Sequence, residues 1–226
     1  MAAGKLKNKF TKKKISNYQD LVIKDGKFVG KFEEMYSKFS DPWNYISIGE
    51  NNIDHKIIIE FCEHIAKTEK KTLTVLEMGC GFGFLSYALA KKGFKTYGFD
   101  ISKTAIRKGK KKFKNKNLKM FVSEFDNFEL FNKIKPDIFI LSDISWYVLP
   151  KLKKFITYFK KTKPAYIVHC LAIPAKQNYG NKFFTSEKSI IKFFNLDIIA
   201  SSNIKFFSET NKNKILETHT YFLAKN

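Results

Sequence analysis

The sequence predicts an α/β protein built on an open, mostly parallel sheet. An apolar run from Leu73 to Leu76 has the length of a strand, and a glycine-rich turn and a segment with apolar residues at helical spacing, 84–92, follow it. A second strand-length run, from Lys95 to Asp100, ends on a carboxylate. A strand, a crossover helix and a second strand form a βαβ unit, which places the two strands side by side and parallel.

The glycines of the turn have a physical role. Gly79, Gly81 and Gly83 carry no Cβ, so the backbone can turn sharply and approach a ligand closely. The helix that begins behind them offers free N–H groups and a partial positive charge. Asp100, at the end of the second strand, can accept both hydroxyls of a ribose. The unit therefore predicts a nucleotide-binding site.

The glycine spacing separates two kinds of nucleotide site. A dinucleotide site requires G-x-G-x-x-G, but the third glycine position holds Phe84 in one register and Ser86 in the other. The chain instead has Glu77-x-Gly79-x-Gly81-x-Gly83, which resembles motif I of the class I S-adenosylmethionine-dependent methyltransferases. The alternative is a glycine-rich turn in an unrelated α/β protein.

The resemblance implies a Rossmann-like, seven-stranded, mostly parallel sheet with a terminal antiparallel strand and an N-terminal helical cap. It implies S-adenosyl-L-methionine as cofactor, with Asp100 in the place of the ribose-binding acid. Glu124 and Phe125 follow the third strand, where the family holds adenine, although Asp126 is an alternative for the acid. The cofactor-binding residues implied are Glu77, Gly79, Cys80, Gly81, Gly83, Asp100, Ile101, Glu124, Phe125 and Asp143.

Length and cysteine content bound the kind of protein. A chain of 226 residues suits one domain with a sizeable core and short additions. No apolar run approaches the ~20 residues of a membrane helix, so we expect no membrane insertion. Three widely spaced cysteines without metal-type spacing suit a reducing cytoplasm, and we expect no metal site.

The net charge of +21 points to anionic partners without favouring nucleic acid. Of 42 basic residues only Arg107 is arginine, whereas proteins that bind phosphates and bases exploit the bidentate guanidinium. Abundant Lys, Asn, Ile and Phe are also typical of an AT-rich genome. We therefore expect a small anionic molecule or a solvated basic surface before a nucleic acid, and the oligomeric state stays open.

The N-terminal part divides into a tail and a cap. Residues 1–16 are basic and aperiodic, which predicts a flexible tail. Residues 17–70 predict a helical cap with helices over 31–39 and 53–67, in which His55 and His64 face outward. Pro42 ends the first helix. The remainder, 71–226, is the predicted catalytic domain.

The segment SDPWNYISIGE resembles an element of small bacterial methyltransferases, such as the nodulation-factor sugar N-methyltransferases. In that family the cap shapes the substrate pocket, so Trp43 and Tyr45 are either walls of that pocket or core residues that anchor the cap.

The remaining elements follow from periodicity and turn signals. Ser102 can cap a helix whose outer face is basic. Further helices are expected over 151–161 and 186–194, and strands over 118–123, 137–143, 164–171, 196–207 and 215–223. The last two fit the terminal β-hairpin that the family resemblance implies.

Two residues at strand ends are candidates for catalysis. Asp143 ends the fourth strand, where it can position an acceptor or contact the cofactor, or else cap the next helix. His169, near the end of the fifth strand, is either a general base or a hydrogen-bonded core histidine. Five aromatic residues are candidate substrate contacts: Trp43, Tyr45, Trp146, Tyr147 and Tyr179.

The predicted function is methyl transfer to a small polar, anionic acceptor. The resemblance suggests a sugar, nucleotide-linked or phosphorylated precursor in bacterial capsule or surface-glycan biosynthesis, including the O-methyl phosphoramidate group. One alternative is an RNA methyltransferase anchored by its basic tail, although the stretch from Asp143 to Tyr147 lacks the Asn/Asp-Pro-Pro-aromatic element of many base-amino methyltransferases. The other is a non-catalytic cofactor-binding domain.

Overall fold

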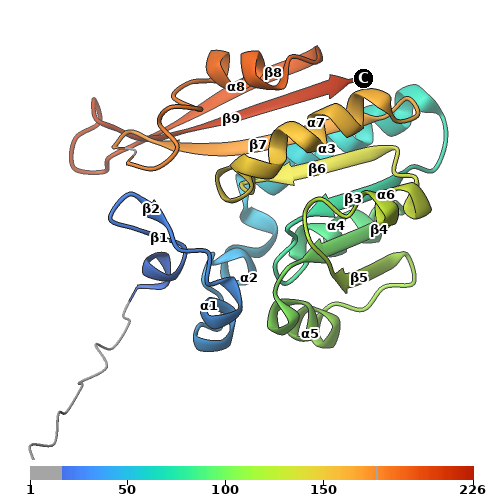
Figure 1. Ribbon diagram of the computed structural model, residues 1–226, viewed down its shortest axis with the longest axis horizontal. Coiled ribbons are helices and arrows are strands. Elements are labelled where there is room, and N and C mark those ends of the chain that lie inside the picture. Colours follow the sequence, from blue (N-terminus) through green and yellow to red (C-terminus); the bar gives the residue numbers. More distant parts are fainter. Residues whose placement is uncertain (1–16, 177) are drawn as a thin grey trace, which may run out of the picture.

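The protein folds around a seven-stranded sheet with the order β5-β4-β3-β6-β7-β9-β8 (Figure 1). The computed structural model describes residues 17–176 and 178–226, so the predicted flexible tail, 1–16, lies outside the described residues. The strands are β3 (Thr74–Met78), β4 (Lys95–Asp100), β5 (Leu118–Val122), β6 (Ile138–Ser142), β7 (Tyr166–Pro174), β8 (Asp197–Phe207) and β9 (Ile215–Lys225).

The sheet is parallel except at β9, which runs antiparallel to both β7 and β8. The predicted class I methyltransferase sheet, with its antiparallel terminal strand, is therefore confirmed. The flanking helices are α3 (Ile53–Glu69), α4 (Phe84–Lys91), α5 (Lys103–Lys112), α6 (Phe128–Ile134), α7 (Leu149–Lys161) and α8 (Glu187–Phe194). The sequence analysis did not predict α6.

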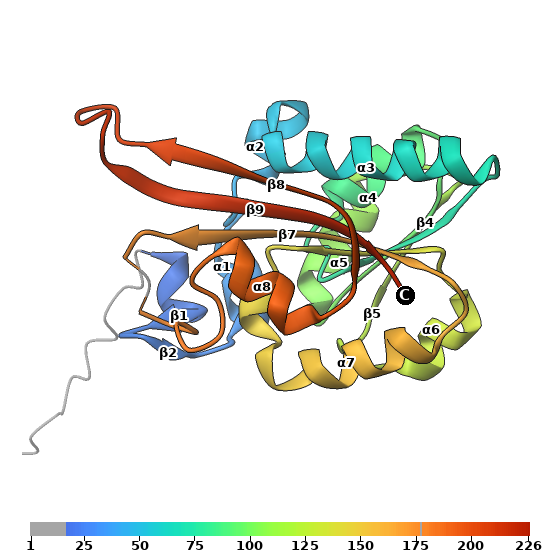
Figure 2. The same cartoon turned by 90° about the horizontal axis from the view of Figure 1, so that it is seen from above.

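The sheet is covered on both faces. Figure 2 shows α3 and α4 on one side and α6, α7 and α8 on the other. Successive residues of a strand point to opposite faces, and β6 follows this rule. Ile138 and Ile140 belong to the core cluster under α3 and α4, whereas Phe139 and Leu141 belong to the cluster under α6, α7 and α8. A strand buried on both faces must be apolar throughout, as this one is.

The connections change direction between β3 and β6. From β3 the chain proceeds outward to β4 and then β5, whereas β6 and β7 extend the sheet the other way. Ligands of open α/β sheets bind outside the carboxyl ends of the strands at such a switch point. The glycine turn and Asp143 both lie there, because they follow β3 and β6 directly.

The cap lies beside the carboxyl ends of the parallel strands (Figure 1). It consists of η1 (Tyr18–Leu21), β1 (Ile23–Lys24), β2 (Lys27–Phe28), α1 (Phe32–Lys38), α2 (Tyr45–Ile48) and η2 (Gly49–Asn51). Met35 and Tyr36 of α1 are buried in one cluster with Phe82 of the glycine turn. The cap therefore packs directly on the predicted nucleotide site.

Helix α3 packs on the sheet, although the predicted cap, 17–70, included it. Its residues Ile58, Cys62 and Ile65 are buried against the strands. Asn52 caps the helix by accepting a hydrogen bond from the His55 N–H at 2.9 Å. His55 was expected to face outward, but it is 4% exposed because it packs between the rings of Tyr45 and Phe84.

Of the two outward-facing histidines expected on this helix, only His64 is exposed. Across the described part of the chain, no helix combines the length and apolar character needed to cross a membrane.

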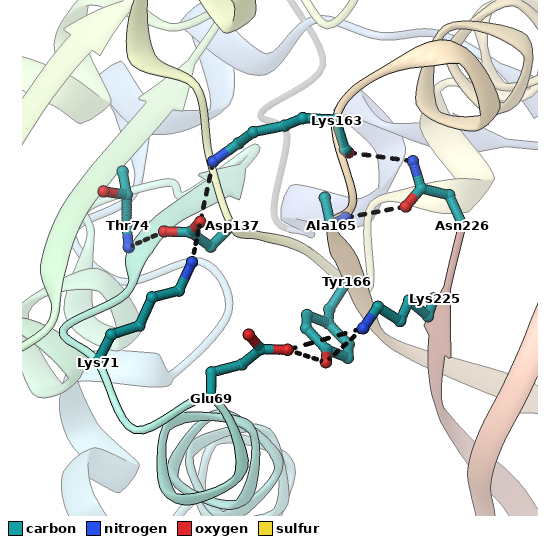
Figure 3. A network of polar contacts seen from close by, with 9 residues as sticks. All are labelled: Glu69, Lys71, Thr74, Asp137, Lys163, Ala165, Tyr166, Lys225 and Asn226. Carbon is teal, nitrogen blue, oxygen red and sulfur yellow. Dashed lines mark hydrogen bonds and ion pairs between the residues drawn. The ribbon is translucent and has the colours of Figure 1, made fainter.

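A polar network fixes the opposite edge of the sheet (Figure 3). Asp137, just before β6, accepts hydrogen bonds from the Thr74 N–H at 2.8 Å, Lys71 at 3.1 Å and Lys163 at 2.9 Å. The Asn226 side chain accepts a bond from the Ala165 N–H at 2.8 Å. The network connects the starts of β3, β6 and β7 to the end of β9. It therefore holds these strands together at the end of the sheet opposite the candidate site.

Candidate active site

The glycine turn after β3 makes a cradle that side chains would fill. Gly79 has φ 74° and Gly81 has φ 55°, in the left-handed region that favours glycine. A Cβ at Gly79 would lie 2.1 Å from Ile144 Cδ1, and a Cβ at Gly81 would lie 2.6 Å from the Tyr36 hydroxyl oxygen. Both contacts are too short for real atoms, so a side chain at either position would have to displace Ile144 or Tyr36 and would also be strained in its backbone conformation.

Asp100 is held beside this turn by backbone donors. Its Oδ2 accepts a hydrogen bond from the Gly81 N–H and its Oδ1 accepts one from the Ser102 N–H, each at 2.9 Å. The residue is 7% exposed, and burial raises the pKa of its carboxyl group to about 6. A carboxylate oxygen has more than one acceptor position, so Asp100 can still receive ribose hydroxyls.

Ile101 lies next to Asp100 and keeps 57% of its surface exposed. An exposed apolar side chain beside a ribose-type carboxylate suits the face of an adenine ring. Together with the glycine cradle, these residues fit S-adenosylmethionine: the turn for close backbone approach, Asp100 for the ribose and Ile101 for the base.

Three other predicted cofactor residues support the turn. Glu77, in β3, accepts a hydrogen bond from the Ser86 hydroxyl of α4, and burial raises the pKa of its carboxyl group to about 7. The Cys80 N–H donates to the Phe99 carbonyl oxygen at 2.8 Å. Gly83 lies against Met120, because a Cβ there would be 2.3 Å from the Met120 sulfur. These contacts fix the strand, turn and helix relative to one another.

Of the predicted adenine-binding residues, the two acids form ion pairs and the phenylalanine is buried in the core. Glu124 and Asp126 both form ion pairs with Lys151, at 2.6 and 2.8 Å, so the lysine brings the two candidate acids together. Phe125 is 5% exposed and its ring packs edge-on against Phe155 in the core. Any contact of Phe125 with adenine would therefore come from its backbone.

Asp143 lies across the switch point from Asp100. Its Oδ1 accepts a hydrogen bond from the Ala172 N–H at 2.8 Å, and its Oδ2 has a long contact of 3.4 Å with the Tyr45 hydroxyl. Burial, and then the negative charge of Asp54, raise the pKa of the Asp143 carboxyl group. The residue nevertheless stays partly exposed to solvent.

Three buried residues near Asp143 were missed by the sequence analysis. Asp54, in the first turn of α3, lies 2.8 Å from Nδ1 of His219 on β9 and accepts a hydrogen bond from the Tyr221 hydroxyl at 2.5 Å. Burial opposes protonation of His219, but its hydrogen bond with Asp54 and its ion-pair contact with Glu217 raise its pKa. The pair is therefore an imidazolium and a carboxylate at neutral pH.

No sequence signal pointed to this pair, because Asp54 and His219 are solitary residues far apart in the chain. The only indication was an acid in the first turn of a helix, which ordinarily interacts with the helix dipole.

Asp54, Asp143 and Cys170 have potential ligand atoms within 4.8 Å of one another. Burial raises the pKa of the Cys170 thiol, and a metal-binding cysteine must be a thiolate. Asp54 already contacts His219 and Tyr221. We assign no metal to this group.

His169 is a core residue, which corrects its prediction as a general base. It is 0% exposed, with its ring stacked on Phe222 at 4.6 Å and edge-on to Phe194 at 4.9 Å. Its Nε2 lies 2.9 Å from the Ser145 hydroxyl. Burial lowers the pKa of His169 to about 3, and no substrate can reach the ring. The alternative interpretation, a hydrogen-bonded core histidine, is the one observed.

The predicted substrate-contact aromatics fall into two groups. Trp43 and Tyr147 have ring centroids 6.1 Å apart, and Phe28 stacks on both Tyr147 and Tyr179 at 6.3 and 6.0 Å, so the cap joins the catalytic part through an aromatic cluster. Trp146 is 8% exposed and donates from its indole to the Ala172 carbonyl oxygen at 2.8 Å. Trp146 is therefore structural, whereas Tyr45 contacts Asp143 directly.

Part of the chain is similar to known methyltransferases. Residues 69–164 match the family model described as a methyltransferase domain. The chain is 34% identical over 116 residues to ribosomal RNA small subunit methyltransferase A of Mesomycoplasma hyopneumoniae. The aligned segment covers 50% of this chain and 43% of that protein. The chain thus spans less than half the length of the curated relatives it matches.

Solved structures share the fold. A SAM-dependent methyltransferase from Aquifex aeolicus is 17% identical, with a TM-score of 0.55 over 85% of this chain and 98% of the other. The bifunctional kinase-methyltransferase WbdD is 16% identical, with a TM-score of 0.55 over 81% of this chain and 41% of WbdD.

The fold, the glycine cradle and the family match define a class I methyltransferase domain. Residues 69–164 match a methyltransferase domain and the chain has the class I methyltransferase fold, which together support S-adenosylmethionine as the cofactor.

Proposed function

We propose that the protein transfers the methyl group of S-adenosylmethionine to a small polar acceptor that binds beside Asp143. The observation that carries the proposal is the presence of two carboxylates at the carboxyl ends of β4 and β6, on either side of β3. Asp100, at the end of β4, suits the ribose of the donor. Asp143 directly follows β6, on the other side of β3, and Ile144 lies against Gly79 of the cradle. An acceptor held by Asp143 would therefore adjoin the methyl end of the donor.

The main contribution of the chain would be orientation. When bound, the donor supplies an electrophilic methyl carbon and leaves as a neutral thioether. Holding the acceptor atom in line with that carbon can contribute about 7–11 kcal/mol as effective concentration. The backbone of the glycine cradle would hold the donor, and Asp143 would hold the acceptor.

Asp143 would receive the proton of the reacting hydroxyl or amine at Oδ2. Its raised pKa, caused by burial and the charge of Asp54, makes it a stronger base than an exposed aspartate. The Tyr45 hydroxyl contacts the same oxygen and would orient it. The Asp54–His219 pair would stay charged, and the negative charge of Asp54 would help to keep the pKa of Asp143 raised.

The acceptor we favour is a phosphorylated or nucleotide-linked sugar from a bacterial capsule or surface-glycan pathway. Its anionic part would meet the lysine-rich surface of this +21 chain. WbdD unites a kinase with a methyltransferase of this fold, and a kinase product is a phosphorylated compound. Asp143 and Asp54 disfavour an ionised phosphate oxygen as the reacting atom, so a hydroxyl or amine is a better candidate than O-methyl phosphoramidate.

The test uses methyl-labelled donor with a metabolite extract separated by anion exchange. We expect label in a small, anionic fraction, and loss of at least about 90% of it with Asp143→Asn, because the variant cannot take a proton. Asp197→Asn, an exposed substitution on β8, is the matched control. Wild-type protein that binds the donor but labels no fraction would instead support the non-catalytic alternative.

An RNA methyltransferase is the second candidate, and two observations favour it. One is the partial match to ribosomal RNA small subunit methyltransferase A. The other is an open groove of about 800 Å³ beside β5, lined in part by Lys110, Lys114, Lys116 and Lys119. A parallel RNA fraction tests it: salt-sensitive labelling of RNA that disappears on removal of residues 1–16 would replace the small-molecule proposal.

A further inference from the structure

Tyr36 of α1 lies against the glycine turn of the donor site. Its ring packs edge-on against Phe82, with ring centroids 5.0 Å apart. Its hydroxyl oxygen lies 2.6 Å from the position of a Cβ at Gly81, so it occupies the edge of the cradle. The side chain is almost fully buried, and burial and the charge of Asp100 raise its pKa. The hydroxyl therefore keeps its proton at neutral pH.

Among the described residues, none accepts the proton of this hydroxyl. Trp43 donates from Nε1 to the Tyr36 oxygen at 3.0 Å, so the oxygen is an acceptor in that bond. Within residues 17–176 and 178–226, no oxygen or nitrogen atom accepts the Tyr36 O–H in return. Buried polar groups are normally satisfied, and a buried donor aimed at a ligand cradle points to an acceptor on the ligand.

The glycine turn itself offers few donors to an anionic group. The Cys80 N–H donates to the Phe99 carbonyl oxygen at 2.8 Å and the Gly83 N–H to the Cys80 carbonyl oxygen at 2.7 Å. The Gly81 N–H is taken by Asp100. Asp100 accepts hydrogen bonds and suits the ribose hydroxyls, whereas the carboxylate of the methyl donor requires proton donors.

We propose that the Tyr36 hydroxyl donates to the carboxylate of the donor's amino-acid part, so that the cap forms one wall of the cofactor site. The proposal rests on the methyl-donor site inferred above. It makes Tyr36 a binding residue and gives the cap a role in holding the cofactor, separate from any contact with the acceptor.

Two polar attachments hold α1 in this position. Near its start, Glu33 accepts hydrogen bonds from the Ser102 and Thr104 hydroxyls, each at 2.6 Å, at the N-terminus of α5. Near its end, the Lys108 ammonium donates to the carbonyl oxygens of Tyr36 and Phe39. Because α5 begins directly after Asp100, the helix that follows the ribose acid also positions the tyrosine.

The test compares two ligands in isothermal calorimetry. S-adenosylhomocysteine has the amino-acid carboxylate, and methylthioadenosine has the same adenosine and sulfur without it. Tyr36→Phe keeps the packing on Phe82 and removes only the hydroxyl. We expect it to lower the affinity for S-adenosylhomocysteine about tenfold or more, as for the loss of a hydrogen bond to a charged group. The affinity for methylthioadenosine should stay within about twofold of the wild-type value.

The matched control is Tyr158→Phe, which removes a hydroxyl that bonds to Asn132. It should leave both affinities unchanged. Hydrogen exchange gives a second measurement: saturating S-adenosylhomocysteine should slow exchange at residues 32–38 in the wild type, and methylthioadenosine should not.

Comparing two ligands within one variant isolates the contact even if Tyr36→Phe lowers the melting temperature. Equal S-adenosylhomocysteine affinity in the wild type and Tyr36→Phe would overturn the proposal, and so would an equal loss for both ligands. Failure of the wild type to bind either ligand would overturn the proposed function itself.

Discussion

Asp54 and His219 stand 165 positions apart in the chain and lie 2.8 Å apart in the fold. Both are about nine-tenths buried, one in the first turn of α3 and the other on β9. The second imidazole nitrogen, Nε2, lies 3.2 Å from Glu217 Oε1, which is an ion-pair contact. The pair connects α3 to the antiparallel strand β9, and Asp54 lies close to Asp143.

Breaking this pair should destabilise the protein. Asp54→Asn leaves a buried imidazole without its counter-charge, and we expect the free energy of unfolding to fall by about 3 kcal/mol. Urea titrations followed by tryptophan fluorescence measure the change. A loss below about 0.5 kcal/mol would mean that the pair contributes little net stability.

The same pair predicts a pH dependence. The pKa of His219 is raised above its ordinary 6.5, so its stabilisation is fully present below pH 6.5 and is lost as the pH rises through the raised value. The pKa of Asp54 is lowered, so its contribution is lost only in acid. Wild-type stability should fall from pH 6.5 to 9, and Asp54→Asn should flatten that fall. His64→Gln, at an exposed position, should keep the wild-type slope.

His169 should affect acid stability and leave the chemistry alone. Its pKa is about 3 in the fold against an ordinary 6.5, so unfolding takes up a proton between these values. Stability should therefore drop by up to about 1.4 kcal/mol per pH unit as the pH falls below 6.5. The double variant His169→Phe with Ser145→Ala removes this proton uptake and the orphaned hydroxyl together.

We expect a shallower acid slope in the double variant, with turnover within about twofold of the wild type. The slope should not vanish, because burial also lowers the pKa of His55, to about 4. A turnover loss of tenfold or more, with donor affinity unchanged, would restore His169 as a catalytic residue.

Asp100→Asn should weaken donor binding about tenfold or more, because it removes a charged acceptor for the ribose hydroxyls. Burial raises the pKa of Asp100 to about 6, so wild-type affinity should also decline as the pH falls below 6. Calorimetry at pH 7.5 and pH 5 checks both statements. If the variant binds as tightly as the wild type at pH 7.5, another residue holds the ribose.

Gly109 in α5 should be intolerant of a side chain. A Cβ there would lie 2.2 Å from the backbone oxygen of Phe82 in the glycine turn. Gly109→Ala must push the turn away from α5. We expect this to lower the free energy of unfolding by about 2 kcal/mol or more. Gly93→Ala, where nothing lies within 4 Å, should lose only about 1 kcal/mol, from its positive φ.

Thermal melts and donor titrations compare these two glycine variants. Gly109→Ala should lose donor affinity as well as stability, whereas Gly93→Ala should keep its affinity. Equal melting temperatures would show that α5 and the turn are less tightly coupled than these distances imply.

The cofactor half of the site was accessible to sequence reasoning because it is local. The cradle and Asp100 come from one βαβ unit, in which periodicity predicts strand, turn and helix, and the glycine spacing predicts close backbone approach. Similar reasoning placed Asp143 at the end of β6. These residues occupy a shared edge simply because parallel strands end together.

The other half depended on how distant segments pack. Periodicity could place His169 on a strand, but only the packing of Phe194 and Phe222 decided that its ring faces the core. Asp54 and His219 carry no spacing signal, and neither does Tyr36, whose hydroxyl proton is accepted by none of the described residues. By itself, the sequence determined the sheet, the turn and the position of Asp100 at the end of β4, because short-range periodicity and backbone freedom fix them. The surroundings of Asp143 and the cap's contact with the cradle were decided by the tertiary structure, because burial, charge pairing and pKa depend on neighbours that meet only when the chain is folded.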